Sequence, residues 1–456
     1  IELDANLPGP LRWLEGRTRP QRFHPLRAPS LLAVEPPAHT RYRQAVSSAF
    51  TPRAVTVLRD GIRDTAEALL DDVERSGAGP AGAVDAMDRY CSQLPIAVIS
   101  ELLGVPDHQR GRLRELGESA ALSLDLGLSW SQYRTVDRGL AAFDEWLTGH
   151  LAELRRNPGD DLLSRLIRAA GGGQVFTVDE LRATAGLLLT AGFETTVNLL
   201  GNGVRLLLGN PHQLALLKDD PQIWPNAVEE ILRLDSPAQL SVRLARRDVE
   251  IAGTHLRRDE MVAVYLGGAN RDPAVFPDPH RFDVTRPNAG RHLTFSGGRH
   301  FCMGAGLARA EGEIGLRTFF DRFPHARASG TAQRRDTRVL RGWSTLPVRL
   351  GPDAGAELVG LLKAGDVDKG VEDIASTIAW VRAQGHAKVG AEGYCLGGLL
   401  AYLTATRTDI DATVGYYGVG IDNYLGEATR AKNPVLLHIA EEDGFVSKDS
   451  QAKMKA

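Results

Sequence analysis

The feature that most constrains the fold is one long apolar segment with clear start and stop signals. Thr177 and Glu180 form the capping box Thr-x-x-Glu, which marks the beginning of a helix. A Gly-Asn-Pro sequence at 209–211 marks its end. The pattern predicts one helix that runs to about Leu208. Four charged or polar residues interrupt the apolar run, so we do not expect it to span a membrane: Arg182, Glu194, Asn198 and Arg205.

The rest of the chain divides into two patterns. Residues 53–240 are mostly helical in character, short β-rich runs and a proline-rich loop fill 241–300, and a helix follows them. A break occurs near Gly351, and helices alternate with strands beyond it, as in a parallel α/β sheet. For a chain of 456 residues we therefore predict two domains, 1–351 and 352–456.

Charge and cysteine content exclude several classes of protein. The net charge of −3 provides no general attraction to nucleic acid or anionic lipid, so neither is an expected partner. Cys91, Cys302 and Cys395 lie far apart in sequence, unlike a disulfide framework or a zinc site with paired ligands. A reducing compartment, the cytoplasm, is the simpler expectation. Because the chain begins at Ile1, we expect a processed product or a fragment.

The stretch FSGGRHFCMGAG, residues 295–306, places Cys302 among glycines. A thiolate is a strong ligand for iron, and Gly298 and Gly304 would let the backbone approach a planar cofactor. Arg299 and His300 add positive charge that suits carboxylates on such a cofactor. A lone cysteine can also be an inert core residue. The nearby GAGLAR sequence does not fit a dinucleotide-binding motif, because it ends in arginine and follows no strand.

The spacing Phe-x-x-Gly-x-x-x-Cys-x-Gly is matched by Phe295, Gly298, Cys302 and Gly304, with His300 between them. It resembles the haem-binding loop of the cytochrome P450 family, and the resemblance extends over residues 30–350. It implies a mainly α fold with small β-sheets and a haem b (iron protoporphyrin IX) whose iron is bound by Cys302. The implied activity is insertion of one oxygen atom of O2 into a hydrophobic small molecule. Electrons would come from a separate ferredoxin and ferredoxin reductase.

The long helix carries the sequence AGFETT at 191–196, which resembles the oxygen-activation motif of that family. Glu194 and Thr195 are polar groups in an apolar helix, and such groups cost free energy unless they are paired or used. We predict that they relay protons to bound dioxygen, with Ala191 beside the cofactor. Gly192 would permit a local opening of the helix, and Thr195 would bond back to a carbonyl. The alternative is a solvated glutamate and a structural threonine.

Basic residues elsewhere match positions that the family uses on the haem propionates. His39 and Arg43 lie four residues apart in HTRYR, Arg243 lies in QLSVRLARRD, and His300 lies in the cysteine loop. Cationic groups that converge on carboxylates make charge-assisted hydrogen bonds. The alternative is a solvated basic surface.

Three further residues have a structural role by resemblance. Glu230 and Arg233 share a helix face, and the family has a buried pair there that an arginine of the proline-rich loop joins, here Arg281. The alternative is a surface ion pair of little worth. Only 34 residues precede Glu35, so we expect the N-terminal part of the domain to be missing. Apolar residues that either line a substrate pocket or pack in the core are Leu187, Leu188, Ala191 and residues 238–240.

The C-terminal region contains a second motif, GYCLGG, at 393–398. It follows a predicted strand and opens a helix, like a nucleophile elbow with cysteine in place of serine. Residues 365–448 resemble dienelactone hydrolase, which implies Cys395 as nucleophile and Asp443 as the acid of a triad. No histidine follows Asp443, and His438 precedes it in a predicted strand. We expect an α/β-hydrolase fragment truncated at both ends, without lactone hydrolysis.

Three hypotheses follow. The first is a haem-thiolate monooxygenase, the second is a cysteine-dependent dienelactone-type hydrolase that uses Cys395, and the third is a haem-binding fragment without turnover. The missing histidine argues against the hydrolase. The pair Glu194–Thr195 favours the monooxygenase, because a protein that only binds haem needs no proton relay.

Overall fold

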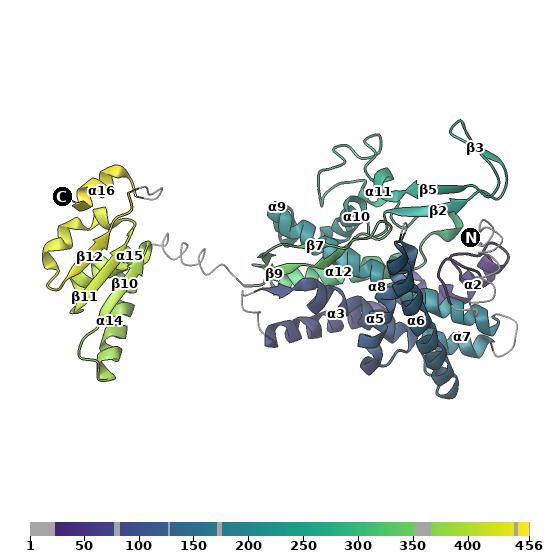
Figure 1. Ribbon diagram of the computed structural model, residues 1–456, viewed down its shortest axis with the longest axis horizontal. Coiled ribbons are helices and arrows are strands. Elements are labelled where there is room, and N and C mark those ends of the chain that lie inside the picture. The colour runs from purple at the N-terminus through teal and green to yellow at the C-terminus, as the bar shows by residue number, and fades with distance from the viewer. Residues whose placement is uncertain are drawn as a thin grey trace. The chain divides into compact units, whose positions relative to one another are not determined.

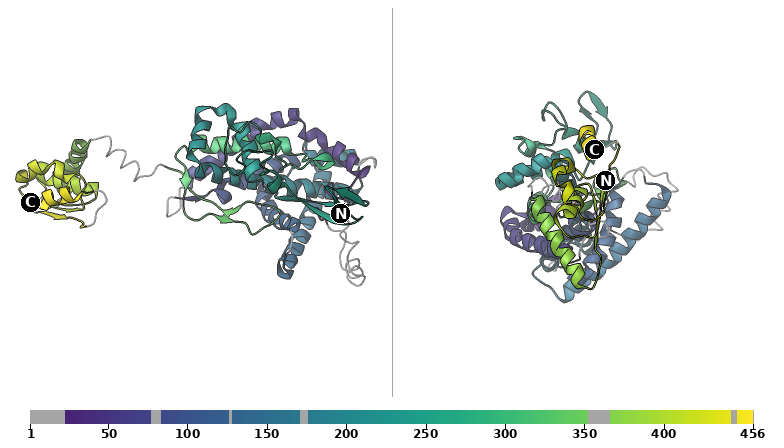
Figure 2. Two further views of the ribbon diagram at one scale, coloured as in Figure 1. Left: turned by 90° about the horizontal axis from the view of Figure 1, so that it is seen from above. Right: turned by 90° about the vertical axis from the view of Figure 1, so that its left-hand side faces the viewer.

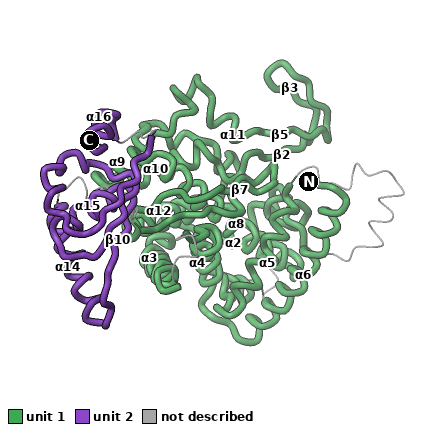
Figure 3. Tube along the Cα trace, turned by 60° about the vertical axis from the view of Figure 1, so that its left-hand side comes forward, with its two compact units in different colours: residues 1–351 green, residues 352–456 purple. Residues whose placement is uncertain are grey.

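The computed structural model describes residues 23–76, 83–125, 128–170, 176–351, 366–441 and 446–455. The chain divides into two compact units, residues 1–351 and 352–456, shown in two colours in Figure 3. Unit 1 is mainly helical and unit 2 is an α/β unit. Among the described residues, no helix has the length and apolar character that crossing a membrane requires.

Unit 1 consists of helices with small sheets at their margin (Figures 1 and 2). Its helices are α2 (Ala38–Ser47), α3 (Pro52–Arg75), α4 (Gln93–Leu103), α5 (Arg110–Ala121), α6 (Trp130–Arg156), α7 (Leu162–Ala170), α8 (Val178–Gly209), α9 (Pro211–Asp219), α10 (Trp224–Leu234), α11 (Leu266–Ala269) and α12 (Ala305–Arg322). The predicted long helix is α8. Its capping box is confirmed: the Glu180 N–H donates to Thr177 Oγ1 at 3.2 Å, and the Thr177 N–H donates to Glu180 Oε2 at 2.7 Å.

In the described part of unit 1, the strands are short and form four small sheets. The first has the antiparallel order β1-β9-β6 (Val84–Asp85, Pro347–Arg349, Arg327–Ala328). The others are two-stranded: β2 (Leu240–Leu244) with β5 (Met261–Tyr265), β3 (Val249–Ile251) with β4 (Thr254–Leu256), and β7 (Gln333–Arg334) with β8 (Trp343–Thr345). The predicted class, mainly α with small sheets, is confirmed.

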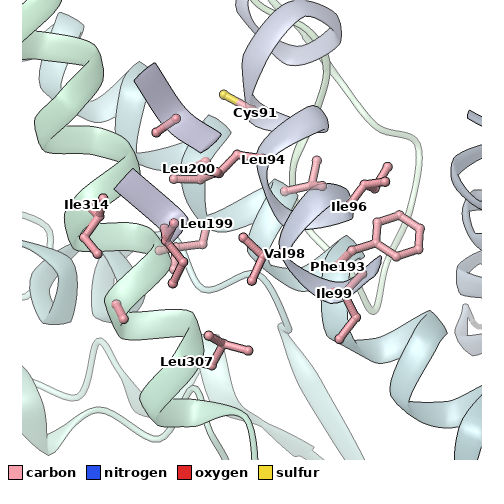
Figure 4. Packing of buried hydrophobic residues seen from close by; sticks show 14 of the residues in the cluster. Cys91, Leu94, Ile96, Val98, Ile99, Phe193, Leu199, Leu200, Leu307 and Ile314 are labelled. Atoms are coloured by element: carbon pink, nitrogen blue, oxygen red, sulfur yellow. The ribbon is translucent and has the colours of Figure 1, made fainter. Parts of the chain in front are cut away.

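Helix α8 lies at the centre of the apolar core of unit 1 and packs against α4, α5, α6, α7, α10 and α12. Figure 4 shows part of this core, with Ile99 of α4, Phe193 of α8 and Leu307 of α12. Contrary to the expectation of a local opening, α8 is continuous through Gly192. A Cβ on Gly192 would lie 2.7 Å from Ile99 Cδ1, so the glycine instead permits the close approach of α4.

The predicted buried pair is present, but its third member was predicted wrongly. Glu230 and Arg233 are both fully buried, and Arg233 Nε donates to Glu230 Oε2 at 2.6 Å. The arginine that joins them is Arg286, whose Nε lies 3.1 Å from Glu230 Oε2, and not Arg281, whose side chain is 64% exposed. The reason is a turn in which the Arg286 N–H donates to the Asp283 carbonyl, which directs Arg286 inward.

Unit 2 has the predicted alternation of helices and strands. Its elements are α14 (Val367–Ala383), β10 (Gly390–Tyr394), α15 (Leu396–Arg407), β11 (Ala412–Tyr416), β12 (Val435–His438) and α16 (Lys448–Lys455). The sheet is parallel, in the order β10-β11-β12, with Tyr394 opposite Tyr416 and Tyr416 opposite His438. Helix α15 packs on all three strands and against α14, around a small apolar core of its own.

Candidate functional site

The cysteine loop of unit 1 is shaped by two backbone hydrogen bonds and by left-handed backbone. The Cys302 N–H donates to the Phe295 carbonyl at 3.0 Å, and the Phe301 N–H donates to the Gly298 carbonyl at 3.0 Å. Gly298 has φ +70°, a conformation that glycine adopts without a steric penalty. Phe295 is held from one side by the Arg309 guanidinium, 4.6 Å from the ring centroid. These contacts present Cys302 just before the start of α12.

The thiol of Cys302 combines a deep position with an accessible side chain. Burial raises its pKa above the ordinary value, although a hydrogen bond from the Gly304 N–H and the charges of Arg43 and Arg309 act in the opposite direction. Nevertheless Cys302 remains exposed, and it forms no disulfide. The backbone hydrogen bond and the two cations act toward the thiolate, the form that binds iron, but burial outweighs them.

The glycines around Cys302 leave room in front of the loop. A Cβ built on Gly297, Gly298 or Gly304 would meet no atom within 4 Å. A flat ring system can therefore approach the backbone of the loop at these glycines.

Two of the predicted propionate ligands lie side by side. The rings of His39 and His300 have centroids 4.5 Å apart, although 261 residues separate them. His39 is 3% exposed, and its Nε2 has no hydrogen-bond partner among the described residues. Burial lowers the pKa of His39, and the positive charges of His300 and Arg43 lower it further. The cluster already holds one carboxylate: Glu35 accepts from Arg299 and from His300 Nε2, each at 3.2 Å.

Arg243 reaches the same loop from strand β2. Its Nη2 donates to Ser296 Oγ at 2.9 Å, and its Nη1 donates to the neighbouring Ser241 Oγ and to the Val242 carbonyl. Ser296 belongs to the cysteine loop and has φ +60°. The basic residues predicted from three distant parts of the sequence thus gather around one loop.

The long helix α8 presents one accessible stripe within an otherwise buried stretch. Between residues 183 and 204, every residue is buried except Leu187, Ala191, Gly192 and Thr195. Leu187, Ala191 and Thr195 are spaced by four residues, so they share one helix face. Helix α8 packs against α12, which begins three residues after Cys302. Leu188, by contrast, is a core residue.

Glu194 and Thr195 have different environments. Thr195 Oγ1 donates to the Ala191 carbonyl at 3.0 Å, the back-bonding that we predicted. Glu194 is 2% exposed, and its Oε1 accepts from Arg335 at 2.5 Å. Burial raises the pKa of Glu194 to about 7; the Arg335 charge lowers it and the Glu118 charge raises it. Sequence reasoning missed Arg335 and Glu118, because the only available signal was that a buried acid needs a partner.

These observations fit a haem. The chain offers a thiol for the metal, glycines that leave space for a flat ring, cations for two carboxylates, and a helix with one accessible stripe. Within the described residues, no group of three or more His, Cys, Asp or Glu side chains forms an alternative metal site. Cys302 is the exposed thiol that lies in the glycine-rich loop with these cations around it.

Unit 2 contains the predicted nucleophile elbow. Cys395 lies between β10 and α15 with φ 55° and ψ −113°, an unusual backbone conformation for a residue other than glycine. A Cβ on Gly393 would lie 1.8 Å from the Gly397 carbonyl oxygen, and one on Gly398 would lie 2.8 Å from Gly418 Cα. The small residues of GYCLGG are therefore needed for this turn.

The remaining members of a triad are not assembled around Cys395 in the described residues. Asp443 lies outside them. His438 ends strand β12, where its ring stacks on Tyr416 with centroids 4.5 Å apart and an interplanar angle of 3°. No hydrogen bond joins Cys395 to a histidine in the part of the chain that the structure describes.

Comparison with known proteins gives two family matches. The model of the cytochrome P450 family matches residues 222–345, and that of the dienelactone hydrolase family matches residues 351–456. A Mycobacterium tuberculosis protein named cytochrome P450 140 is 64% identical over 355 residues, which are 77% of this chain and 80% of that protein. The 6-deoxyerythronolide B hydroxylase of Saccharopolyspora erythraea is 45% identical over 322 residues, 69% of this chain and 76% of the hydroxylase.

Comparison with solved structures also finds cytochrome P450 enzymes. CxnD, described as a cytochrome P450 enzyme for C–S bond formation in chuangxinmycin biosynthesis, is 34% identical to this chain with a TM-score of 0.68. The match covers 76% of this chain and 83% of CxnD. Both resemblances inferred from the sequence, to cytochrome P450 and to dienelactone hydrolase, are confirmed.

Proposed function

Because the chain belongs to the cytochrome P450 family and is a monooxygenase, we propose that unit 1 carries out the reaction RH + O2 + 2 e⁻ + 2 H⁺ → ROH + H2O. The substrate RH is a hydrophobic small molecule, and the electrons come from a ferredoxin and its reductase. We place the activity in residues 1–351, in the cytoplasm, and assign no step of it to residues 352–456.

The observation that carries the proposal is the accessible Cys302 on a loop whose glycines leave space in front of it. We assign Cys302 as the residue that would hold the iron of a haem b as a thiolate, and the loop residues Phe295, Gly298 and Gly304 would contact the cofactor. When bound, the haem iron supplies the activation of dioxygen. His39, Arg43, Arg243 and His300 would bind the propionates, because cations that converge on carboxylates make strong hydrogen bonds.

The accessible stripe of α8 would face the other side of the haem. Leu187 and Ala191 offer apolar contacts to a substrate, and Thr195 offers a hydroxyl among them. Each turnover consumes two protons, and they must be delivered at this face. Thr195 would donate the proton, and Glu194 would replace it, since an acid whose pKa lies near 7 can both take up and release a proton at neutral pH.

Two matched substitutions test the assignment. The purified chain is reduced under carbon monoxide, and its Soret band is recorded. We expect the strongly red-shifted band of a thiolate-ligated haem in the unmodified chain and in Cys395→Ser, and no such band in Cys302→Ser. Both cysteines are exposed, so each variant serves as the control for nonspecific effects of a cysteine-to-serine substitution on the fold. The reverse pattern, or no haem signal in the unmodified chain, would contradict the proposal.

Turnover is tested separately from binding. The loaded chain receives electrons from a ferredoxin and its reductase, together with a panel of hydrophobic substrates. A hydroxylated product that carries label from ¹⁸O2 supports the monooxygenase. Haem binding without product from any substrate would favour the third hypothesis, a haem-binding fragment without turnover.

A further inference from the structure

A small pocket lies where the end of α5 meets α8 and the residues between β7 and β8. It brings together two acidic side chains that are 76 residues apart in sequence, Glu118 of α5 and Glu194 of α8. Its complete lining is Glu118, Ala121, Leu122, Asp125, Glu194, Arg335, Thr337 and Leu340. Three carboxylates and one cation around a small space are not what a core-packing role requires.

The two oxygens of Glu194 differ. Oε1 accepts from Arg335, whereas Oε2 is buried and has no hydrogen-bond partner among the described residues. A buried carboxylate oxygen without a hydrogen-bond partner costs folding free energy unless it is protonated or accepts a hydrogen bond from a water molecule. Because Glu194 lines the pocket, the pocket is where such a water can lie, with Glu118 and Thr337 as further polar neighbours.

Glu118 differs from Asp125 in its hydrogen bonding. Asp125 Oδ1 accepts the N–H groups of Arg338 and Val339, at 2.7 and 2.8 Å, and so holds the loop. The Glu118 side chain is half-buried and forms no ion pair within the described ranges. Glu118 is thus partly accessible to solvent, and it also lines the pocket that Glu194 shares.

We propose that Glu118 is a positioning residue for proton supply: it passes protons from solvent, through water in this pocket, to Glu194 and so to Thr195. The proposal rests on the proposed function and extends it, since the α8 pair alone does not say how protons reach a buried acid. One proton enters at Glu118 as one leaves Glu194, so no charge accumulates in the pocket. The protons that follow this path are the two that each turnover consumes.

The charges that face Glu194 are consistent with this role. Arg335, from the segment after β7, stabilises the carboxylate, while burial and the charge of Glu118 favour the protonated form. Asp125 adds a further negative charge to the same pocket. The net result is a pKa of about 7 for Glu194, where a small change of environment shifts its protonation.

The decisive variant is Glu118→Gln, because it keeps the shape of the side chain and removes the exchangeable proton. Its control is Glu115→Gln on the same helix, where an exposed glutamate pairs with Arg112 at 3.1 Å. Both variants should retain the thiolate-type Soret band. Positioned proton transfer contributes about 10²–10⁴-fold to rates, so we expect Glu118→Gln to lower O2-dependent product formation by about tenfold or more and to enlarge the solvent isotope effect. Glu115→Gln should match the unmodified chain.

Hydrogen peroxide provides a rescue. It supplies both oxygen atoms, both electrons and both protons of the reaction, RH + H2O2 → ROH + H2O, so it bypasses proton supply from the pocket. Product formation from peroxide should be equal in Glu118→Gln and in the unmodified chain. An equal loss with O2 and with peroxide would mean that Glu118 only supports the fold of the site, and it would overturn the proposal.

A readout independent of turnover is the infrared carboxyl band of protonated Glu194, identified by its absence in Glu194→Gln. Removing the charge of Glu118 should shift the titration of this band to lower pH, whereas Glu115→Gln should leave it in place. An unchanged titration in Glu118→Gln would overturn the claim that the two acids interact. Absence of the thiolate band in the unmodified chain would overturn the proposed function and this path with it, whereas a normal band with unchanged O2 turnover in Glu118→Gln would overturn the path alone.

Discussion

The buried arginine that joins Glu230 allows a quantitative test of the fold around the cysteine loop. Arg286 is 6% exposed, and its Nε lies 3.2 and 3.1 Å from the two oxygens of Glu230. Its other nitrogens donate to the backbone carbonyls of Pro277, Asp278 and Arg281, at 2.6, 3.2 and 3.0 Å. One side chain thus ties the proline-rich loop to α10.

Arg286→Ala removes all of these hydrogen bonds at once. Breaking a buried ion pair from one side costs about 3–5 kcal/mol, because the remaining charge stays buried. Arg233 still binds Glu230 through Nε and Nη2, at 2.6 and 2.8 Å. The remaining pair keeps the expected loss of unfolding free energy near the lower end of that range. The Pro277 carbonyl loses its donor as well, whereas the Asp278 carbonyl keeps the Arg281 N–H and the Arg281 carbonyl keeps Arg233 Nη2. We therefore expect unit 1 to lose about 3–4 kcal/mol of unfolding free energy.

Arg281→Ala is the matched control, since the sequence predicted this residue in the role of Arg286. Its side chain is 64% exposed and lies 3.9 Å from Asp283, so its removal should cost no more than about 0.5 kcal/mol. The loss of unfolding free energy in Arg286→Lys should lie between the losses in Arg281→Ala and Arg286→Ala, because a single ammonium cannot reproduce the planar fork of the guanidinium.

Hydrogen exchange in increasing urea measures the effect on unit 1 alone, through peptides that cover α10 and α12. Unfolding of a two-unit chain is not expected to be a single transition, and exchange separates the units. A loss in Arg281→Ala as large as that in Arg286→Ala would refute the reasoning. So would an Arg286→Ala chain with unchanged protection in α10.

Two further predictions concern α8. Glu194 holds its proton more tightly when folded, with a pKa of about 7 against 4.5 for the unperturbed group, so its contribution to stability is fully present below pH 4.5 and is lost as the pH rises to about 7. The difference amounts to about 3 kcal/mol, and Glu194→Gln should flatten the unfolding free energy of unit 1 between pH 4.5 and about 7; an unchanged slope would contradict the burial of this acid. Gly342→Ala should destabilise unit 1 by about 1–3 kcal/mol, because its Cβ would lie 1.8 Å from Oδ1 of the fully buried Asn198. Adding Asn198→Ala should recover part of that loss in urea unfolding, and no recovery would argue against this contact.

The parts of the structure that the sequence predicts well depend on neighbouring residues. The start of α8 follows from Thr177 and Glu180, which bond each other across three residues. The turn at Cys395 follows from the glycines around it, because each allows a specific close approach. The prediction of strands and helices in unit 2 succeeded for the same reason, since alternation of the two is a local pattern.

The parts that were missed depend on how distant segments meet. Arg281 and Arg286 lie in one loop, and only the turn at Asp283 decides which of them points toward Glu230. The partner of Glu194 is 141 residues away, and nothing around Arg335 in the sequence distinguishes it from the arginines beside it. Such pairings follow from the packing of α5, α8 and the β7–β8 region, which no single stretch of sequence encodes.

The central position of α8 has a consequence for how this enzyme can change. Most of the helix is held on every side by other helices, so substitutions there will be lost to misfolding before they alter chemistry. Ala191 is exposed, and Leu187 and Thr195 are only partly buried, so these three positions are less constrained. Directed evolution toward new substrates should therefore accumulate changes at Leu187 and Ala191, while Thr195 is retained for the proton transfer proposed above and the rest of the helix stays almost constant.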